Sequence, residues 1–245
     1  MQKTNNVKRI SGRANDELRQ IALIPNYYNY GDGSCFVKFG NTHIICAATI
    51  EEKTPLFLRN TRTGWISAEY GILPCSCSDR TDREAAKGKQ SGRTQEIQRL
   101  IGRSLRSVVD LSILGERQIK IDCDAIQADG GTRTASITGA YIALYIACQK
   151  LLKKGKMERN PIKSHVVAVS CGIVNDAVLL DLNYAEDSKA EVDSNFIMSD
   201  DKIIEIQSCG EQRPFSEDEF FQLLNYAKKA RKELIEKQKI ALRLQ

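Results

Sequence analysis

Several kinds of catalytic machinery are missing from this 245-residue sequence. It contains only two histidines, His43 and His165, so a zinc site built from several histidines is excluded. No Gly-x-Ser-x-Gly segment is present, which argues against the nucleophile elbow of α/β-hydrolases. No convincing Cys–His pairing is visible either. The chain therefore offers no obvious protein nucleophile.

Targeting and membrane signals are also scarce. The first residues are polar and basic and lack the apolar core of a signal peptide, and no run of residues approaches the apolar length that we expect of a membrane span. The eight cysteines include no Cys-x-x-Cys pair and no repeating spacing, which favours reduced thiols. Cys75 and Cys77 have no matching second pair, so a soft-metal site there is not favoured. We expect a cytoplasmic protein that does not enter a membrane.

Charge is present and unevenly placed. The formal net charge is +5, and residues 59–106 alone hold ten Lys or Arg against five Asp or Glu. A basic bias confined to one region indicates a polyanionic partner such as RNA. The length permits a full hydrophobic core, arranged as one large domain or as two small lobes.

The order of apolar patterns predicts an α+β protein with helices packed on largely antiparallel sheets. Turn residues at 40–42 and at Asn175-Asp176 predict two hairpins, and residues 65–73 predict a further strand. Ser216-Glu217-Asp218-Glu219 is a capping box, so we expect a C-terminal helix over residues 216–238. Residues 1–15 are expected to form a flexible N-terminal arm of a single domain covering residues 1–245.

A helix is predicted from Thr94 to Asp110, because apolar residues recur there at helical spacing. Arg93 stands at its start, next to Gly92, where it can serve either as a ligand contact or as a solvated residue. The preceding stretch resembles a P-loop only faintly, because Lys87 replaces the first glycine and Arg93 replaces the lysine. ATP binding by that route is rejected.

The stretch from residue 119 to residue 138 predicts a strand, a double glycine and then a helix. A helix start leaves backbone N–H groups without partners, and glycine allows an anion to approach them. Thr132 adds a hydroxyl and Arg133 a guanidinium that can bind phosphate with two parallel bonds. The segment indicates a phosphate site, although a glycine pair that ends a strand can also be no more than a turn.

Carboxylates gather between Asp181 and Asp193, directly after a predicted strand. Hard cations such as Mg²⁺ are held by one or two carboxylates together with waters and substrate phosphates, so this loop is a candidate metal site. A solvated acidic loop is the alternative. A phosphate site, a divalent metal, several arginines and no protein nucleophile together suit a reaction in which phosphate itself attacks.

Three segments, namely residues 64–74, 83–103 and 122–140, closely resemble the bacterial ribonuclease PH family, and the resemblance extends from about Gly12 through the last helix. It implies a ribonuclease PH-like (ribosomal protein S5 domain 2-like) fold of mixed sheets packed with helices. It also implies a phosphate-dependent 3′-to-5′ exoribonuclease that trims the 3′ ends of tRNA precursors reversibly and releases nucleoside diphosphates. Related folds occur in polynucleotide phosphorylase and exosome core subunits, and the implied assembly is a homohexamer, a trimer of dimers.

The resemblance assigns roles residue by residue. Inorganic phosphate, the co-substrate, would be held by Arg93, Gly131, Thr132 and Arg133; Mg²⁺ or Mn²⁺ by Asp187 and Asp193; and RNA by Arg59, Arg80 and Arg83. Of these, Arg93, Arg133, Asp187 and Asp193 would be catalytic.

The chain departs from the family pattern at three positions that bear on RNA affinity: Leu56, Cys75 and Cys77. Two other functions stay open. A non-catalytic RNA-binding subunit of an exosome-like ring would have lost the phosphate or metal residues. A hydrolytic nuclease would release nucleoside monophosphates without needing phosphate.

Overall fold

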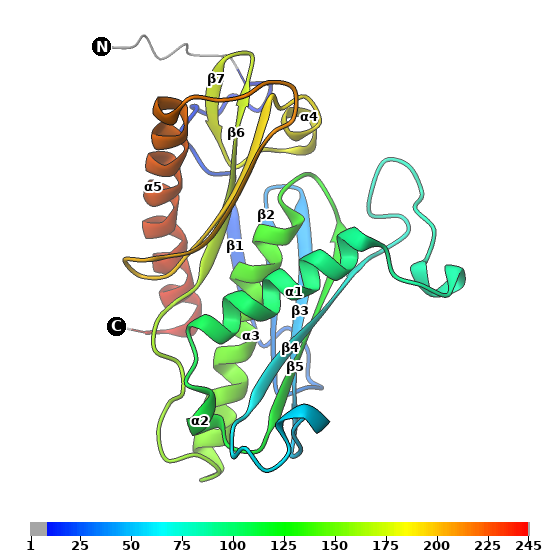
Figure 1. Ribbon diagram of the computed structural model, residues 1–245, viewed down its shortest axis with the longest axis vertical. Helices are drawn as coiled ribbons and strands as arrows, with labels where there is room; N and C mark the ends of the chain where they lie inside the picture. Colours follow the sequence, from blue (N-terminus) through cyan, green and yellow to red (C-terminus); the bar gives the residue numbers. More distant parts are fainter. Residues whose placement is uncertain (1–8, 245) are drawn as a thin grey trace.

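The computed structural model describes residues 9–244, and its core elements are two β-sheets with helices packed on them (Figure 1). The first sheet has five strands in the order β1-β2-β3-β5-β4. Neighbouring strands are antiparallel except β4 and β5, which run parallel because helix α1 connects them. The strands are β1 Ile21–Pro25, β2 Gly33–Phe39, β3 Thr42–Glu51, β4 Trp65–Ile72 and β5 Gln118–Gln127.

The second sheet is fully antiparallel and has the order β7-β6-β8-β9. Its strands are β6 Val167–Val174, β7 Ala177–Leu180, β8 Val192–Met198 and β9 Ile203–Gly210. The hairpin predicted at Asn175-Asp176 is confirmed. Both residues have positive φ, 50° and 58°, as a two-residue hairpin turn that follows the strand twist requires.

Three long helices complete the packing: α1 Gly92–Ser107, α3 Thr132–Lys153 and α5 Glu217–Leu242. The short elements are α2 Leu111–Leu114, α4 Tyr184–Asp187 and the 3₁₀ turns η1 Leu56–Leu58 and η2 Glu84–Lys87. Helix α3 contacts β2, β3, β5 and also β6, so it lies between the two sheets, whereas α5 stands along β6, β7 and β1 (Figure 1). One continuous hydrophobic core runs through both sheets.

Helix α3 is buried on most of its surface. Fifteen of its residues are buried, because sheets cover it on more than one side. By length and composition alone α3 could cross a membrane, whereas no such segment was expected from the sequence. However, 72% of its most apolar window is buried inside the protein, so its apolar residues belong to the core. Gly139 shows how close this packing is, since a Cβ there would lie 2.0 Å from a methyl of Val37.

The predicted element order is confirmed, with differences at the ends. The C-terminal helix begins at Glu217 and continues to Leu242, four residues beyond the predicted end. Strand β1 was not predicted, and the acidic segment after β7 contains the helical turn α4. Most of the predicted N-terminal arm, residues 1–8, lies outside the described residues; of the remainder, Arg9 is buried.

Candidate active site

The double glycine between β5 and α3 forms a tight turn that only glycine fits. Gly130 and Gly131 both have positive φ, 73° and 67°, a conformation that costs little without a Cβ. A Cβ on Gly130 would also lie 2.7 Å from the carbonyl oxygen of Leu182, in the segment that follows β7. The turn thus brings the start of α3 against the start of the acidic segment.

Helix α3 begins without a side-chain cap, because its N-cap residue is Gly131. Its first backbone N–H groups therefore face outward without a capping acceptor, which is the arrangement that binds anions. Thr132 is buried, and its Oγ1 accepts a 2.9 Å hydrogen bond from the hydroxyl of Tyr70 on β4. Since that oxygen is already an acceptor, the Thr132 hydroxyl proton is available to a ligand.

Arg133 is half-buried and held from two sides. Its Nη1 donates to Oε1 of Gln207 on β9 at 3.0 Å, and the same nitrogen lies 3.5 Å from a carboxylate oxygen of Glu96 on α1. Gln207 in turn donates to Glu96 at 3.0 Å. Two elements from distant parts of the chain, β9 and α1, thus fix the guanidinium beside the start of α3.

Arg93 lies in the first turn of α1 and is exposed. Ser91 caps this helix by accepting from the backbone N–H of Thr94 at 3.1 Å. Arg93 lines a cavity of about 450 Å³ together with Tyr70, the residue that donates to Thr132 at the α3 start. Burial raises the pKa of Tyr70 and of Asp187, and the positive charge of Arg93 opposes both rises. The structure therefore places Arg93 in the same region as Thr132 and Arg133.

Asp187 ends α4 and Asp193 lies in β8, and both are half-buried. Burial raises the pKa of Asp187, while the charges of Arg93 and Arg133 oppose the rise. Burial, followed by the negative charge of Asp187, raises the pKa of Asp193 to about 6. Two neighbouring carboxylates that repel each other in a partly dehydrated site form a donor set that fits a divalent cation.

Within residues 9–244, no group of three or more His, Cys, Asp or Glu side chains is arranged to hold a metal ion. A cation at Asp187 and Asp193 would thus have two carboxylate ligands and complete its shell with water or substrate oxygens, as Mg²⁺ commonly does.

Sequence comparisons identify the family. The 3′ exoribonuclease family matches in two parts, its domain 1 over residues 17–149 and its domain 2 over residues 164–230. The chain belongs to the ribonuclease PH family. Two curated proteins called Ribonuclease PH, from Rhodospirillum rubrum and Cereibacter sphaeroides, are each 54% identical over 96% of this chain and cover 98% and 99% of their own lengths.

Solved structures confirm the ribonuclease PH-like fold. An Archaeoglobus fulgidus exosome with RNA bound to the active site matches with a TM-score of 0.80 at 24% identity, over 94% of this chain and 92% of that one. Rice (Oryza sativa) Rrp46 matches with a TM-score of 0.74 at 19% identity, over 94% and 98% of the two chains.

The arginines that the family resemblance assigns to RNA are not gathered in one place. Arg80 pairs with Asp82 at 3.3 Å in the exposed loop after β4, and Arg83 lines a cavity of about 480 Å³ with Tyr70 and Asp124 at the same end of that strand. Arg59 follows η1, before the start of β4. The eight residues of β4 separate these ends by about 23 Å.

The three residues that depart from the family pattern also lie near opposite ends of β4, one near its start and two after its end. Leu56 lies in η1 and is 79% exposed. Cys75 is exposed and Cys77 is half-buried, both in the loop after β4. An exposed leucine and a cysteine supply no cation to an RNA phosphate, so neither end of β4 gains basic character from these positions.

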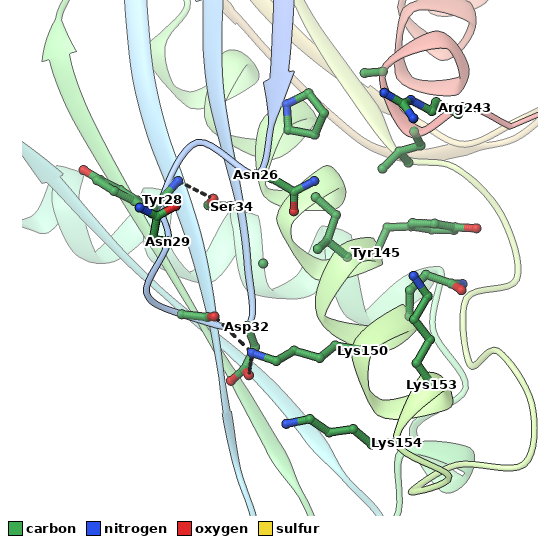
Figure 2. Close-up of a pocket in the computed structure, with 17 residues that line it drawn as sticks. Asn26, Tyr28, Asn29, Asp32, Ser34, Tyr145, Lys150, Lys153, Lys154 and Arg243 are labelled. Atoms are coloured by element: carbon green, nitrogen blue, oxygen red, sulfur yellow. Dashed lines mark hydrogen bonds and ion pairs between the residues drawn. The ribbon is translucent and has the colours of Figure 1, made fainter.

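A large cavity of about 820 Å³ lies elsewhere in this ribonuclease PH fold (Figure 2). It is lined by the C-terminal part of α3, including Lys150 and Lys153, by the loop between β1 and β2, and by Arg243 after α5. Lys150 is paired there with Asp32 at 2.6 Å. The first α3 residue that lines this cavity is Tyr145, about 20 Å along the helix from its start at Thr132. None of the predicted site residues lines it.

Sequence reasoning missed several residues that contact the predicted site, among them Tyr70, Glu96 and Gln207. The alternation in β4 places Tyr70 on the same face as buried Ile66, so its burial could have been predicted, but not its contact with Thr132. Glu96 and Gln207 reach Arg133 across 37 and 74 residues of sequence, and no local pattern signals such pairs.

Proposed function

We propose that this ribonuclease PH family member shortens the 3′ ends of RNA, tRNA precursors in particular, by phosphorolysis. The observation that carries the proposal is the uncapped start of α3. Tyr70 contacts Thr132 there and lines one cavity with Arg93, and the backbone N–H of Tyr184, which begins the α4 turn that ends at Asp187, donates to Asp129 of the adjoining turn at 3.1 Å. Donors for a phosphate and donors for a divalent cation are thus adjacent, as transfer of RNA to phosphate requires. The 54% identity to proteins called Ribonuclease PH supports the same reaction.

In the proposed reaction the α3 backbone N–H groups, Thr132, Arg133 and Arg93 hold inorganic phosphate in line with the last phosphodiester of the RNA. A phosphate oxygen forms a bond to the phosphorus of the terminal nucleotide, and the bond from that phosphorus to the 3′ oxygen of the preceding nucleotide breaks. The 3′ oxygen takes up the proton that the attacking phosphate loses, and a nucleoside diphosphate is released. A phosphodiester bond is exchanged for the phosphoanhydride bond of the nucleoside diphosphate, so the same site can run the reaction in reverse.

Asp187 and Asp193 would hold Mg²⁺ or Mn²⁺, which when bound offsets negative charge on the diester. The arginines neutralise the rest, since two anions must come together before bond formation. The protein's share of catalysis is therefore positioning and charge neutralisation, in agreement with the lack of a protein nucleophile.

We further propose that the chain works in the cytoplasm as a homohexameric ring, a trimer of dimers. The position of Arg59 agrees with a ring, because an arginine one strand length from its own phosphate site can contact RNA that approaches a neighbouring subunit. The Archaeoglobus structure, an exosome with RNA bound to its active site, has the same fold. Light scattering coupled to size-exclusion chromatography tests the proposed stoichiometry.

The deciding experiment follows the decay of a 3′-extended tRNA precursor with and without inorganic phosphate. The proposal expects decay only with phosphate and nucleoside diphosphates as products. Nucleoside monophosphates formed without phosphate would indicate a hydrolytic nuclease, and RNA binding with no decay would indicate a non-catalytic ring subunit. An Arg133→Ala variant with full activity would contradict the assignment of the site.

A further inference from the structure

Three arginines that precede β1, namely Arg9, Arg13 and Arg19, contact residues next to the candidate site, although none of them is part of the reaction described above. Arg9 and Arg19 are only 4% and 7% exposed, and Arg13 is held between their two acidic partners, Asp181 and Glu186. We infer that these three arginines and two acidic residues, here called the arginine clamp, hold two parts of the site in position relative to each other. These parts are the turn at residues 129–131, here called the phosphate-binding turn, and the carboxylate of Asp187. The inference rests on the proposed function.

Arg19 connects the phosphate-binding turn to the second sheet. Its Nη1 donates to the carbonyl oxygens of Asp129 at 2.6 Å and Gly130 at 3.4 Å. On the other side its Nε and Nη2 donate to the two carboxylate oxygens of Asp181 at 3.1 and 2.8 Å. The planar guanidinium thus fixes the distance between the turn and Asp181, which a flexible lysine could not do.

Asp181 is a rigid anchor for this contact. Its side chain is fully buried, and its backbone has a left-handed φ of 54° directly after β7. Its N–H donates to the carbonyl of Ser170 at 2.7 Å, and its carboxylate also accepts from the backbone N–H of Arg19 at 2.8 Å. The structure around it therefore over-determines this conformation, which keeps Arg19 in one place.

Thr42 completes the support of the turn. Its hydroxyl donates to the carbonyl of Gly130 at 2.6 Å and accepts from the N–H of Asp129 at 3.0 Å. The residue is fully buried at the start of β3. The two residues that precede Gly131 are thus held by one hydroxyl and one guanidinium.

Arg9 supports the part of the site that carries the candidate metal ligand Asp187. Its Nε and Nη2 donate to the two carboxylate oxygens of Glu186 at 2.8 and 2.7 Å, and its Nη1 donates to the carbonyl of Leu180 at 2.9 Å. Glu186 directly precedes Asp187 and closes the α4 capping box by accepting from the N–H of Asn183 at 3.0 Å. Arg9 therefore fixes the helical turn that carries the candidate metal ligand.

Arg13 lies between the carboxylates of Asp181 and Glu186 and so connects the contacts of Arg19 with those of Arg9. It lies 3.6 Å from the carboxylate of Asp181 and 3.5 Å from that of Glu186, and it donates to the carbonyl of Asp181 at 3.0 Å. Burial, and then the charge of Arg9, lowers the pKa of Arg13 to about 10. Three cations with two carboxylates in a buried place add little net stability, because desolvation offsets their attraction; what they provide is fixed geometry.

Arg19→Lys tests the phosphate half of the clamp. Lysine keeps the charge but cannot hold Asp181 and both carbonyls at once, so we expect the KM for phosphate to rise about tenfold or more while kcat changes little. Arg117→Lys is the matched control, because Arg117 also joins a carboxylate, Glu52 at 2.8 Å, to a main-chain carbonyl, Leu114 at 3.0 Å, near the other end of β5. A folded Arg19→Lys protein with unchanged KM for phosphate contradicts the clamp.

Thr42→Val is the second variant, used if Arg19→Lys does not fold. It has the same shape and no charge, and it removes the two hydrogen bonds to the turn together with a 3.4 Å hydrogen bond that Arg19 donates to the Thr42 hydroxyl. We expect the KM for phosphate to rise about threefold. An unchanged KM in the folded variant contradicts the inference, as does a fall in kcat alone.

Glu186→Gln tests the metal half. The glutamine oxygen can still accept from Asn183 and keep the capping box, while the ion pair with Arg9 is lost. We expect direct Mn²⁺ binding, followed by electron paramagnetic resonance, to weaken about threefold to tenfold. Glu219→Gln is the control, since Glu219 closes the capping box of α5 and pairs with Arg213 at 2.8 Å in the same way. Unchanged Mn²⁺ affinity in folded Glu186→Gln contradicts this half.

The outcomes separate the clamp from the proposed function. RNA decay by the unaltered protein that is independent of phosphate overturns the function before any variant is compared. If the unaltered protein binds no Mn²⁺, the metal assignment fails, and the response to phosphate in Arg19→Lys or Thr42→Val decides the clamp by itself.

Discussion

Arg133 and Glu96 form an ion pair of 3.5 Å beside the turn that is proposed to bind phosphate, with the side chain of Glu96 36% exposed. A phosphate that binds Arg133 must compete with this carboxylate. A partly exposed pair of this kind is worth no more than about 1 kcal/mol, or about fivefold in affinity. The charge of Arg133 is therefore partly compensated in the free protein.

Glu96→Gln is expected to lower the KM for phosphate by about twofold to fivefold, because the competing charge is removed while an oxygen remains to accept from Gln207. Steady-state kinetics at varied phosphate measures the effect. Glu52→Gln, which removes a carboxylate paired with Arg117, should leave that KM unchanged. A raised KM in Glu96→Gln would mean that Glu96 orients Arg133 more than it competes for it.

Tyr70→Phe removes the hydroxyl that donates to Thr132 at 2.9 Å. With that donor gone, the Thr132 hydroxyl can rotate away from the ligand, so we expect the KM for phosphate to rise about threefold and the stability to fall by about 1 kcal/mol. Kinetics and thermal unfolding measure the two effects. In Tyr145→Phe, which alters α3 far from its start, the KM for phosphate should not change. An unchanged KM in Tyr70→Phe would show that this hydrogen bond serves packing only.

The raised pKa of Asp193 predicts that the stability of the metal-free protein depends on pH. Its pKa is raised from 3.8 to about 6 in the folded protein, so the folded protein holds a proton on this carboxyl below about pH 6. Above that pH the carboxyl is ionised, and its burial lowers the free energy of unfolding. Asp193→Asn should therefore raise the Tm in EDTA at about pH 7.5, by about 2–6 °C, and give no gain below about pH 4. Calorimetry at the two pH values measures this. An equal gain at both would show that charge is not the cause.

Ser91→Ala removes the cap of α1, where Ser91 accepts from the N–H of Thr94 and Glu84 accepts from the Thr94 hydroxyl at 2.8 Å. Loss of such a cap costs about 1 kcal/mol and frays the first turn, which carries Arg93. We expect the KM for phosphate to rise about threefold in kinetic assays. Asp110→Ala removes the cap of α2 instead, at 3.1 Å from the N–H of Ser112, and should affect stability alone. The same KM in both variants would place Arg93 outside the site.

The sequence predicted those parts of the fold that local chemistry determines. The α1 stripe, the Asn175-Asp176 turn and the capping box at Ser216 each depend on residues a few positions apart, and all three are present. Strand β1 was missed because it is a short edge strand. The burial of α3 on several sides was missed because it depends on the second sheet, which lies far along the chain.

The candidate site was likewise predictable only where its residues are close in sequence or belong to the family pattern. Gly131, Thr132 and Arg133 are consecutive, so their common position was predictable, and the family resemblance supplied Arg93, Asp187 and Asp193. The residues that support them could not be found in this way. Arg9 reaches Glu186 across 177 residues and Arg19 reaches Asp181 across 162, and a charge pattern read along the chain gives no sign of either pair.

The separation of Arg19 from Asp181 also bears on the synthesis of the protein. A nascent chain contains the phosphate-binding turn as soon as Gly131 has been made, but the carboxylate that anchors its support follows fifty residues later, and Glu186 later still. Contacts between such distant residues form late, because a long loop must close first. An unfinished chain on the ribosome would thus hold no formed phosphate site, so it could not degrade the RNA around it before its own synthesis is almost complete.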